Sequence, residues 1–214
     1  MPSGAGDVHI LRDITLGLPA AKTVSIVGPS GSGKTTLLMV LGGLEKPSSG
    51  RIHVAGQELT HLSEDALAAF RRDNIGIIFQ SFHLIPSMTA LENVAVPLEF
   101  AGAPDAFDKA KAALEAVGLG HRLSHYPGQL SGGEQQRTAI ARAFVTSPRL
   151  ILADEPTGNL DHDTGQKVID LMFDMTRRNG TTLVLVTHDN QLADRCDIKI
   201  SIRDGQIQAG GDAA

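Results

Sequence analysis

One glycine-rich segment limits what this chain can fold into. Residues 28–35 read Gly-Pro-Ser-Gly-Ser-Gly-Lys-Thr and match the pattern G-x-x-x-x-G-K-[ST] in full. The β-branched run from Thr23 to Val27 predicts a buried strand before the segment, and Lys34 to Leu41 predict a helix after it. A glycine-rich turn between a buried strand and a helix predicts a phosphate-binding loop in an α/β fold.

The residue types in this loop suit a nucleotide. Its glycines let backbone N–H groups converge on phosphate oxygens, and the start of the following helix adds its dipole. Lys34 can reach the β- and γ-phosphates of ATP, and the Thr35 hydroxyl can hold Mg²⁺. The plain alternative is a Gly-Ser turn before an ordinary helix. The predicted nucleotide-binding residues are Gly28, Pro29, Ser30, Gly31, Ser32, Gly33, Lys34, Thr35 and Thr36.

Two adjacent acids follow a second buried run. Leu150 to Ala153 predict a strand, and Asp154 and Glu155 stand at its carboxyl end, where α/β sheets bind ligands. Asp154 is expected to hold Mg²⁺ through water, and Glu155 to orient or deprotonate an attacking water. The alternative is a strand that simply ends in charged loop residues.

The rest of the chain predicts one α/β domain with a helical insertion. Further strands are expected at residues 8–16, 51–55, 75–79 and 182–186, and a hairpin at 198–208. Alternation of strands and helices favours a mainly parallel sheet with helices on both faces. From Leu84 to Ala143 the periodicity is helical. We therefore expect a core at about 1–83 and 146–214, and a helical subdomain at about 84–145.

Composition excludes several classes. The chain has 214 residues and a formal net charge of −5, so nonspecific nucleic-acid binding is disfavoured. Cys196 is the only cysteine, so no disulfide can form within the chain. No apolar run reaches the roughly 18 residues that span a bilayer.

A third motif suggests a second phosphate site. Residues 130–136 read Leu-Ser-Gly-Gly-Glu-Gln-Gln before a helical stretch. Ser131 and Glu134 have capping-box spacing, which is the plain interpretation. Two glycines in a first helical turn are nevertheless costly unless something approaches the backbone closely, and a helix start with free N–H groups binds anions.

With this motif the sequence resembles the nucleotide-binding subunits of ATP-binding cassette (ABC) transporters, a P-loop NTPase family whose signature is L-S-G-G-x-Q. Gln80 matches the Q-loop and His188 the switch histidine of that family. Residues 158–161, Gly-Asn-Leu-Asp, match its D-loop, which ends at Asp161. Residues 154–161 and 90–94 resemble the MacB, LolD and FtsE branch, and residues 118–123 and 193–197 the YbbA group within it. The resemblance covers about residues 8–208.

The resemblance implies a role for each motif. Two copies would form a head-to-tail dimer with two ATP molecules at the interface. Glu155 and His188 would be catalytic. The residues that would bind Mg²⁺ are Thr35, Gln80 and Asp154. Asp161 would reach across the interface. The residues that would contact the partner's ATP are Ser131, Gly132, Gly133, Glu134 and Gln135.

The resemblance also implies a membrane partner. That partner would be an integral permease of the MacB, LolC/LolE, FtsX or YbbP type at the cytoplasmic face of the inner membrane, moving lipid-linked or amphiphilic cargo. The alternatives are an FtsE-like regulator of cell-envelope enzymes, a soluble ABC ATPase that acts on nucleic acid, which the composition disfavours, and an inactive scaffold. The apolar residues that follow Gln80 would form a docking groove or plain core: Phe82, Leu84, Ile85, Pro86 and Met88.

The sequence departs from the family pattern at its start. The family places a strand and an adenine-stacking aromatic residue before the region where Met1 falls, and the first aromatic residue here is Phe70. We expect that the true start lies upstream; the alternatives are that the chain binds adenine more weakly or that another apolar residue takes the place of the aromatic one. Ala21 and Lys22 replace a usual Gly-Glu pair in a turn outside the site, where little effect is expected.

Overall fold

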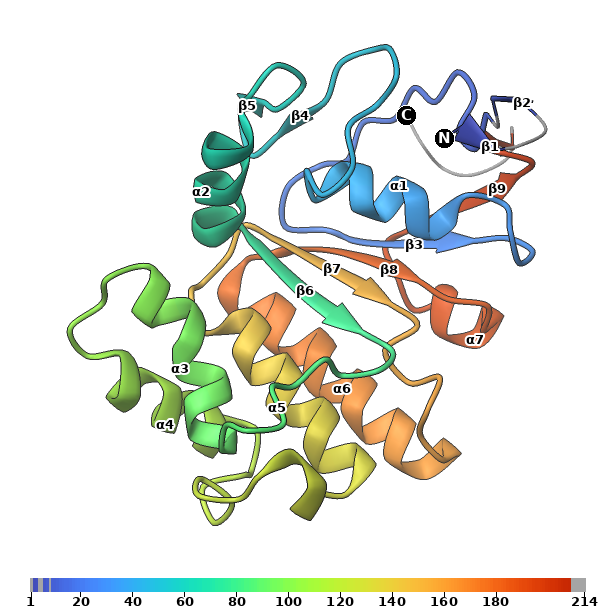
Figure 1. The fold of residues 1–214 in the computed structure, drawn as a ribbon. Coiled ribbons are helices and arrows are strands. Elements are labelled where there is room, and N and C mark those ends of the chain that lie inside the picture. Colours follow the sequence, from blue (N-terminus) through green and yellow to red (C-terminus); the bar gives the residue numbers. More distant parts are fainter. Residues whose placement is uncertain (1, 4–5, 8, 209–214) are drawn as a thin grey trace.

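The computed structural model describes residues 2–3, 6–7 and 9–208 and is built around a six-stranded sheet (Figure 1). The strand order is β10-β9-β3-β8-β7-β6, and every neighbouring pair is parallel except β10 with β9. The strands are β3 (Thr23–Val27), β6 (Ile75–Phe79), β7 (Leu150–Asp154), β8 (Thr182–Val186), β9 (Ile198–Arg203) and β10 (Gln206–Ile207). Two separate antiparallel pairs join β1 (Pro2–Ser3) to β2 (Gly6–Asp7), and β4 (His53–Val54) to β5 (Gln57–Glu58).

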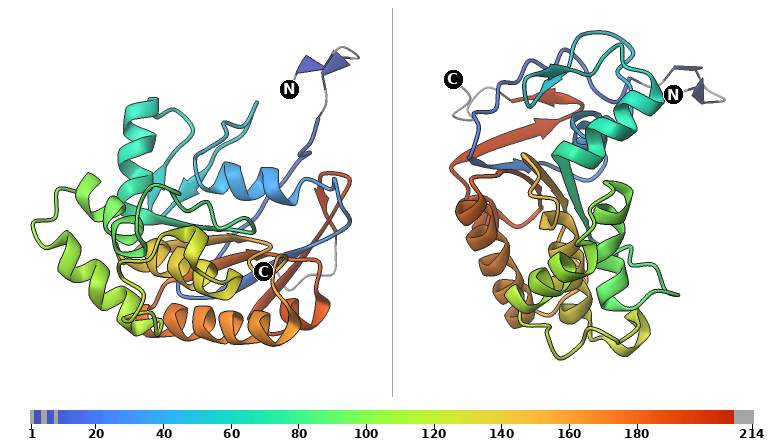
Figure 2. Two further views of the ribbon diagram at one scale, coloured as in Figure 1. Left: turned by 60° about the horizontal axis from the view of Figure 1, so that its bottom comes forward. Right: turned by 90° about the vertical axis from the view of Figure 1, so that its left-hand side faces the viewer.

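Helices cover both faces of this sheet, which the buried apolar runs of the central strands require (Figures 1 and 2). One face carries α1 (Lys34–Leu41) and α2 (Glu64–Asn74). The other carries α5 (Gly132–Phe144), α6 (His162–Asn179) and the short α7 (Asn190–Ala193). Beside α5 lie α3 (Ala90–Phe100) and α4 (Ala106–Ala116), followed by a 3₁₀ turn at Pro127–Gln129.

Three hydrophobic clusters hold these layers together. The first lies between the sheet and α1 with α2, the second between the sheet and α5 with α6, and the third among α3, α4 and α5. Helix α5 belongs to two of them, since Ile140 packs in the sheet cluster and Ala141 in the helical cluster. A β-carbon on Gly76 of β6 would meet the Ala143 carbonyl oxygen at 2.3 Å, so α5 lies directly on the sheet. The subdomain limits given above therefore stay a prediction, because α5 serves both parts.

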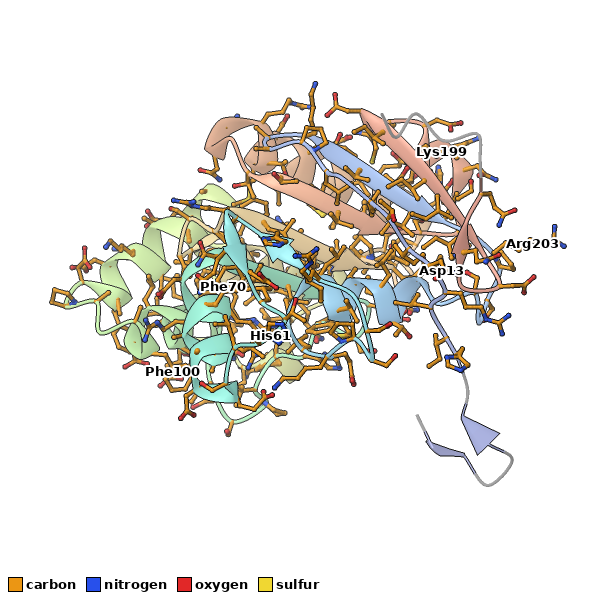
Figure 3. The ribbon with its side chains drawn as sticks, turned by 90° about the horizontal axis from the view of Figure 1, so that it is seen from above. Asp13, His61, Phe70, Phe100, Lys199 and Arg203 are labelled. Carbon is orange, nitrogen blue, oxygen red and sulfur yellow. The ribbon has the colours of Figure 1, made fainter. Side chains whose placement is uncertain are left out.

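The expected first strand is wrong over the residues described. Residues 9–16 form an irregular segment, and Val8 lies outside the described residues. Asp13 has φ of 49°, which breaks an extended conformation, while Leu11, Ile14 and Leu16 still pack against the first cluster. The Arg12 N–H donates to the Gly205 carbonyl at 2.8 Å, which places this segment beside the turn between β9 and β10 (Figure 3).

The strand expected at residues 51–55 is shorter than predicted. Only His53 and Val54 pair, with β5, because Ala55 and Gly56 both have positive φ and form the two-residue turn of a hairpin. The hairpin expected at residues 198–208 is confirmed by β9 and β10. Among the helices of the described residues, none is long and apolar enough to cross a membrane.

Candidate nucleotide site

The phosphate loop lies between β3 and α1, at the carboxyl edge of the parallel strands (Figure 1). Gly33 is the N-cap of α1 with φ of 98°, and Gly31 has φ of 78° with nothing within 4 Å of its β-carbon direction. These left-handed positions favour glycine. Gly31 is exposed, whereas Gly33 is buried and a β-carbon there would meet Leu11 at 2.9 Å. The Lys34 ammonium donates to the carbonyls of Gly28 and Pro29 at 2.9 and 2.8 Å, so it lies over the loop. Thr36, the third residue of α1, is half-buried.

The loop meets the end of β7 through one side-chain contact. The Thr35 hydroxyl donates to the Asp154 carboxylate at 3.0 Å, although the two residues are 119 positions apart. A hydroxyl and a carboxylate so close together match the ligands that Mg²⁺ takes alongside nucleotide phosphates. The two residues expected to bind the metal from these motifs therefore lie together.

Glu155 and His188 also lie together. His188 Nδ1 lies 2.8 Å from one Glu155 carboxylate oxygen and 2.9 Å from the other. An ionised carboxylate only accepts hydrogen bonds, so Nδ1–H donates. The His188 side chain is 78% exposed. Glu155 has φ of 47°, and its N–H donates to the Val186 carbonyl of β8 at 3.0 Å. The sheet thus fixes the backbone of a carboxylate that can orient a water.

Gln80 contacts the D-loop. Its side-chain amide donates to Asn159 Oδ1 at 3.3 Å, and the Asn159 amide donates to the Gln80 carbonyl at 3.0 Å. A β-carbon on Gly158 would meet Gln80 Nε2 at 2.6 Å, so this glycine permits the close approach. Within the described residues no hydrogen bond joins Gln80 to Thr35 or Asp154. Its expected role as a metal ligand therefore stays a prediction. Asn159 belongs to the D-loop motif, but the sequence does not indicate its contact with Gln80.

The signature residues start α5. Ser131 is the N-cap, and its hydroxyl accepts from the Glu134 N–H at 3.3 Å while the Glu134 carboxylate accepts from the Ser131 N–H at 2.8 Å. The predicted capping box is therefore present. The Gln135 amide donates to the Leu130 carbonyl at 3.1 Å. A β-carbon on Gly133 would meet Thr164 Cγ2 at 2.5 Å, and one on Gly132 would meet Leu160 at 3.3 Å, so α5 packs beside the start of α6.

An acidic and a basic side chain, Glu134 and Arg122, pair beside this helix start. The Ser131 backbone N–H is the largest cause that lowers the pKa of Glu134, to about 2, and the Ser131 hydroxyl and Arg122 add to it. Arg122 Nε lies 2.8 Å from the other Glu134 oxygen. Arg122 was not identified from the sequence, where nothing separates it from other surface arginines.

Asp161 caps the next helix. Its carboxylate accepts from the Thr164 N–H at 3.0 Å at the start of α6, which lowers its pKa. Between the two helix starts, the Gln136 amide donates to the Pro156 carbonyl at 2.6 Å, and Gln136 is fully buried. This contact attaches α5 to the loop that follows Glu155. Gln136 follows directly on the signature, but its sequence position alone did not indicate a role.

The turn between β9 and β10 supports the phosphate loop. The Gly205 N–H donates to the Ser32 carbonyl at 3.1 Å, and a β-carbon on Gly28 would meet the Ile202 carbonyl oxygen at 2.0 Å. The Asp204-Gly205 pair predicts the turn but not its contact with the loop, because this contact depends on β9 lying next to β3.

The arrangement fits ATP with Mg²⁺. An open glycine backbone, a helix start, an ammonium over the loop and the Thr35–Asp154 pair are the groups that a nucleotide triphosphate and its metal require. Bound Mg²⁺ supplies charge neutralisation at the phosphates. The chain itself positions the phosphates with backbone N–H groups, holds Glu155 where it can orient a water, and holds His188 against that carboxylate.

Comparison with known proteins agrees with this site. Residues 11–158 match the protein family described as "ABC transporter". The chain is 50% identical over 207 residues to the ABC transporter ATP-binding protein YbbA of Escherichia coli, covering 96% of this chain and 91% of that protein. It is 50% identical over 194 residues to the lipoprotein-releasing system ATP-binding protein LolD of Idiomarina loihiensis, covering 90% and 85%.

A solved structure has the same fold. The dimeric ATP-binding cassette MJ0796, in a post-hydrolysis state with ADP and phosphate, matches with a TM-score of 0.89 at 40% identity, covering 97% of this chain and 92% of that one.

The chain therefore belongs to the ABC transporter family. It is an ATP-binding and ATP-hydrolysing subunit of that family, with ATP and Mg²⁺ as its nucleotide and metal. The expected resemblance to the LolD and YbbA branch and the expected α/β cassette fold are confirmed.

Proposed function

We propose that two copies of this chain close head-to-tail around two ATP molecules and that this closure drives a membrane permease. Each ATP lies between the phosphate loop of one copy and the signature residues of the other, and Asp161 lies at the interface. The observation that carries the proposal is that one chain has two helix starts suited to phosphate, at Gly33 and Ser131, and its own nucleotide needs one.

The chemistry of each turnover follows from the contacts above. ATP binds the closed pair more tightly than the separate copies, because it bridges both helix starts, and so it shifts the population toward closure. Glu155, held by His188, orients the attacking water. Hydrolysis and release of phosphate remove the bridge, and the pair opens.

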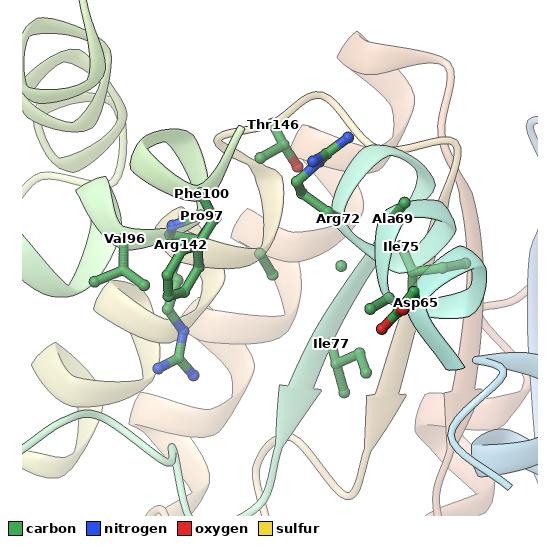
Figure 4. Close-up of a pocket in the computed structure, with 13 residues that line it drawn as sticks. Asp65, Ala69, Arg72, Ile75, Ile77, Val96, Pro97, Phe100, Arg142 and Thr146 are labelled. Atoms are coloured by element: carbon green, nitrogen blue, oxygen red, sulfur yellow. The ribbon is translucent and has the colours of Figure 1, made fainter. Parts of the chain in front are cut away.

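An apolar groove is the proposed docking place of the permease. It measures about 660 Å³ and lies between α2, β6, α3 and α5 (Figure 4). Ile77, Val96 and Phe100 line it together with Arg72 and Arg142, and Phe100 is 75% exposed. An amphipathic helix of a permease, with one apolar face and an acidic residue, suits such a lining.

This groove differs from the segment considered in the sequence. None of the five apolar residues between Phe82 and Met88 lines the groove or belongs to a hydrophobic cluster of the described residues. The buried Asn93 amide orders this segment by donating to the carbonyls of Ile85, Met88 and Thr89. The segment borders α3 and extends the proposed docking surface.

The names of the relatives bear on the cargo of the permease and on the location of this chain in the cell. LolD is the ATP-binding protein of a lipoprotein-releasing system, and YbbA is an ABC transporter ATP-binding protein. We infer that the permease extracts or exports lipid-linked or amphiphilic cargo, and that this chain sits at the cytoplasmic face of the membrane through it. A permease whose outer domain binds cell-wall enzymes would instead support the regulatory, FtsE-like alternative.

A matched pair of variants tests the coupling. Phe100→Glu places a charge in the groove, whereas Phe107→Glu places the same charge on α4, outside the groove lining, at another exposed phenylalanine. ATPase is measured for the chain alone and for the chain reconstituted with its permease, which is first identified by pull-down with ATP and Mg²⁺. We expect Phe100→Glu to keep the basal rate and lose permease stimulation, and Phe107→Glu to keep both. Equal stimulation of the two variants would contradict the docking proposal.

A further inference from the structure

The turn after Gln80 has an uncommon backbone. Phe82 and His83 have φ of 61° and 47°, so two consecutive residues with side chains adopt the left-handed conformation. The His83 N–H donates to the Ser81 carbonyl at 2.6 Å, and the rings of Phe79 and His83 are 4.6 Å apart. Such conformations persist only where surrounding contacts hold them, and they gather at functional positions. We call residues 80–83 the Gln80 turn.

Arg142 makes those contacts from a distant part of the chain. Its Nη1 donates to the His83 carbonyl at 2.6 Å and its Nη2 to the Phe82 carbonyl at 2.8 Å. Arg142 lies near the end of α5, the helix that Ser131 begins. Figure 4 shows it projecting from α5 into the groove beside Val96 and Phe100.

The guanidinium depends on these two carbonyls. Within the described residues no carboxylate forms an ion pair with Arg142, and burial lowers its pKa. The planar guanidinium presents its N–H donors in a fixed fork, so two neighbouring carbonyls can be bound at once with little loss of side-chain freedom. An ammonium would hold the same two carbonyls with a less fixed geometry.

The Gln80 turn thus joins two parts of the site, the D-loop and the signature helix. Gln80 itself contacts Asn159 of the D-loop. Through Arg142 the same turn is joined to α5, whose first residues are the signature. A helix of 13 residues moves as a rigid element, so a displacement of the turn shifts the signature as well.

We propose that Arg142 is a positioning residue that links the Gln80 turn to the signature helix, so that nucleotide bound at one copy's own site sets the orientation in which its signature meets the partner's ATP. This inference rests on the proposed head-to-tail dimer. It assigns Arg142 to closure of the pair and not to binding of nucleotide by a single copy.

The test compares arginine variants in a Glu155→Gln parent, in which closed dimers accumulate. The variants are Arg142→Gln, Arg142→Lys and the control Arg71→Gln. Arg71 is also a half-buried arginine that donates to a backbone carbonyl at 2.6 Å, that of Gly43, but it lies on α2 away from the Gln80 turn. Three quantities are measured: the midpoint of thermal unfolding, the affinity of the monomer for a fluorescent ATP analogue, and the protein concentration at half-dimerisation with ATP and Mg²⁺ by analytical ultracentrifugation.

The expected results separate positioning from plain stability. Arg142→Gln raises the concentration for half-dimerisation by at least about tenfold, the effect of losing a charged hydrogen-bonded contact, while monomer nucleotide affinity stays within about twofold. Arg142→Lys keeps the positive charge but loses the planar fork of donors. Its concentration for half-dimerisation lies between those of Arg142→Gln and the parent. Arg71→Gln dimerises like the parent.

Other results would overturn the inference. These are parent-like dimerisation of Arg142→Gln, equal impairment of Arg71→Gln, or a nucleotide affinity that falls by the same factor as dimerisation. If Arg142→Gln does not fold, Arg142→Lys against Arg71→Lys decides in the same way. A parent that does not dimerise with ATP would overturn the proposed function itself, whereas a dimerising parent with an unaffected Arg142→Gln overturns the inference alone.

Discussion

The phosphate loop and the signature helix are both helix starts suited to phosphate, yet they are held in different ways. The phosphate loop is fixed by contacts from far along the chain, from Asp154 on β7 and from Gly205 after β9. The hydrogen bonds between Ser131 and Glu134 lie within the first turn of α5. Arg122 donates to Glu134 from outside the helix, and Gly133 packs beside Thr164 of α6. The first site is completed by its own chain, and the second is only pre-organised by it.

This difference has a functional meaning. Groups that bind a nucleotide held by their own chain need ligands from several elements of that chain. Thr35 of α1 and Asp154 of β7 meet in this way. Groups that bind a partner's ligand need only a stable orientation and free access, which the capping box at Ser131 provides. The contrast supports the proposal that the signature acts on the other copy.

The largest expected effect is at the chemical step. Glu155→Gln keeps the size of the side chain and removes the negative charge, so we expect kcat to fall by about 10²–10⁴-fold, the usual contribution of a general base. ATP binding should persist, since Lys34 and the loop are untouched. Steady-state ATPase and nucleotide titration measure the two effects, and a kcat within tenfold of the wild type would contradict the role of Glu155.

A change at the signature should affect activity without affecting the fold. Gly132→Asp adds an acid to the first turn of α5, which helices favour, and its β-carbon meets two side chains, Leu160 at 3.3 Å and Phe82 at 3.9 Å. The same charge repels the partner's phosphates. We expect unfolding temperature and monomer ATP affinity to be preserved and ATPase to fall by at least about tenfold, the usual coupling energy between sites being of this order. Gly132→Asp with normal ATPase would remove the distinction between the two helix starts.

A smaller effect concerns pH. The folded chain holds the pKa of Glu134 at about 2, below that of the unfolded chain. Its stabilisation is therefore complete above about pH 5 and is lost as the pH falls toward 2. Glu134→Gln should remove this dependence, worth on the order of 1–2 kcal/mol in the free energy of unfolding after solvent screening. Urea denaturation between neutral and acidic pH measures it, and parallel pH profiles for variant and wild type would contradict the assignment.

The sequence predicts the local elements of this molecule well. The strand Thr23–Val27 and the helix Lys34–Leu41 are found with the expected bounds, because an apolar β-branched run and a glycine-flanked helix are local signals. The capping box at Ser131 was also predicted correctly from the spacing of Ser131 and Glu134. The irregular segment before β3 could not be predicted, because the left-handed conformation of Asp13 has no sequence signal as strong as glycine.

Contacts that depend on the arrangement of elements could not be read from the sequence. Asn159 reaches Gln80 only because β6 lies next to β7 in the sheet. Arg142 reaches the Gln80 turn only because α5 packs on β6. Arginines are common on helices, and neither its spacing nor its neighbours distinguish this one.

The central claim is that the signature of one copy serves the ATP of the other, and complementation tests it most directly. Lys34→Ala impairs the phosphate loop and leaves the signature intact, and Gly132→Asp does the reverse. Each variant alone should have little ATPase, while an equal mixture forms mixed dimers with one complete site, restoring roughly a quarter of wild-type activity if subunits pair at random in a head-to-tail dimer. No restoration at any mixing ratio, with both variants folded and exchanging subunits, would contradict the account.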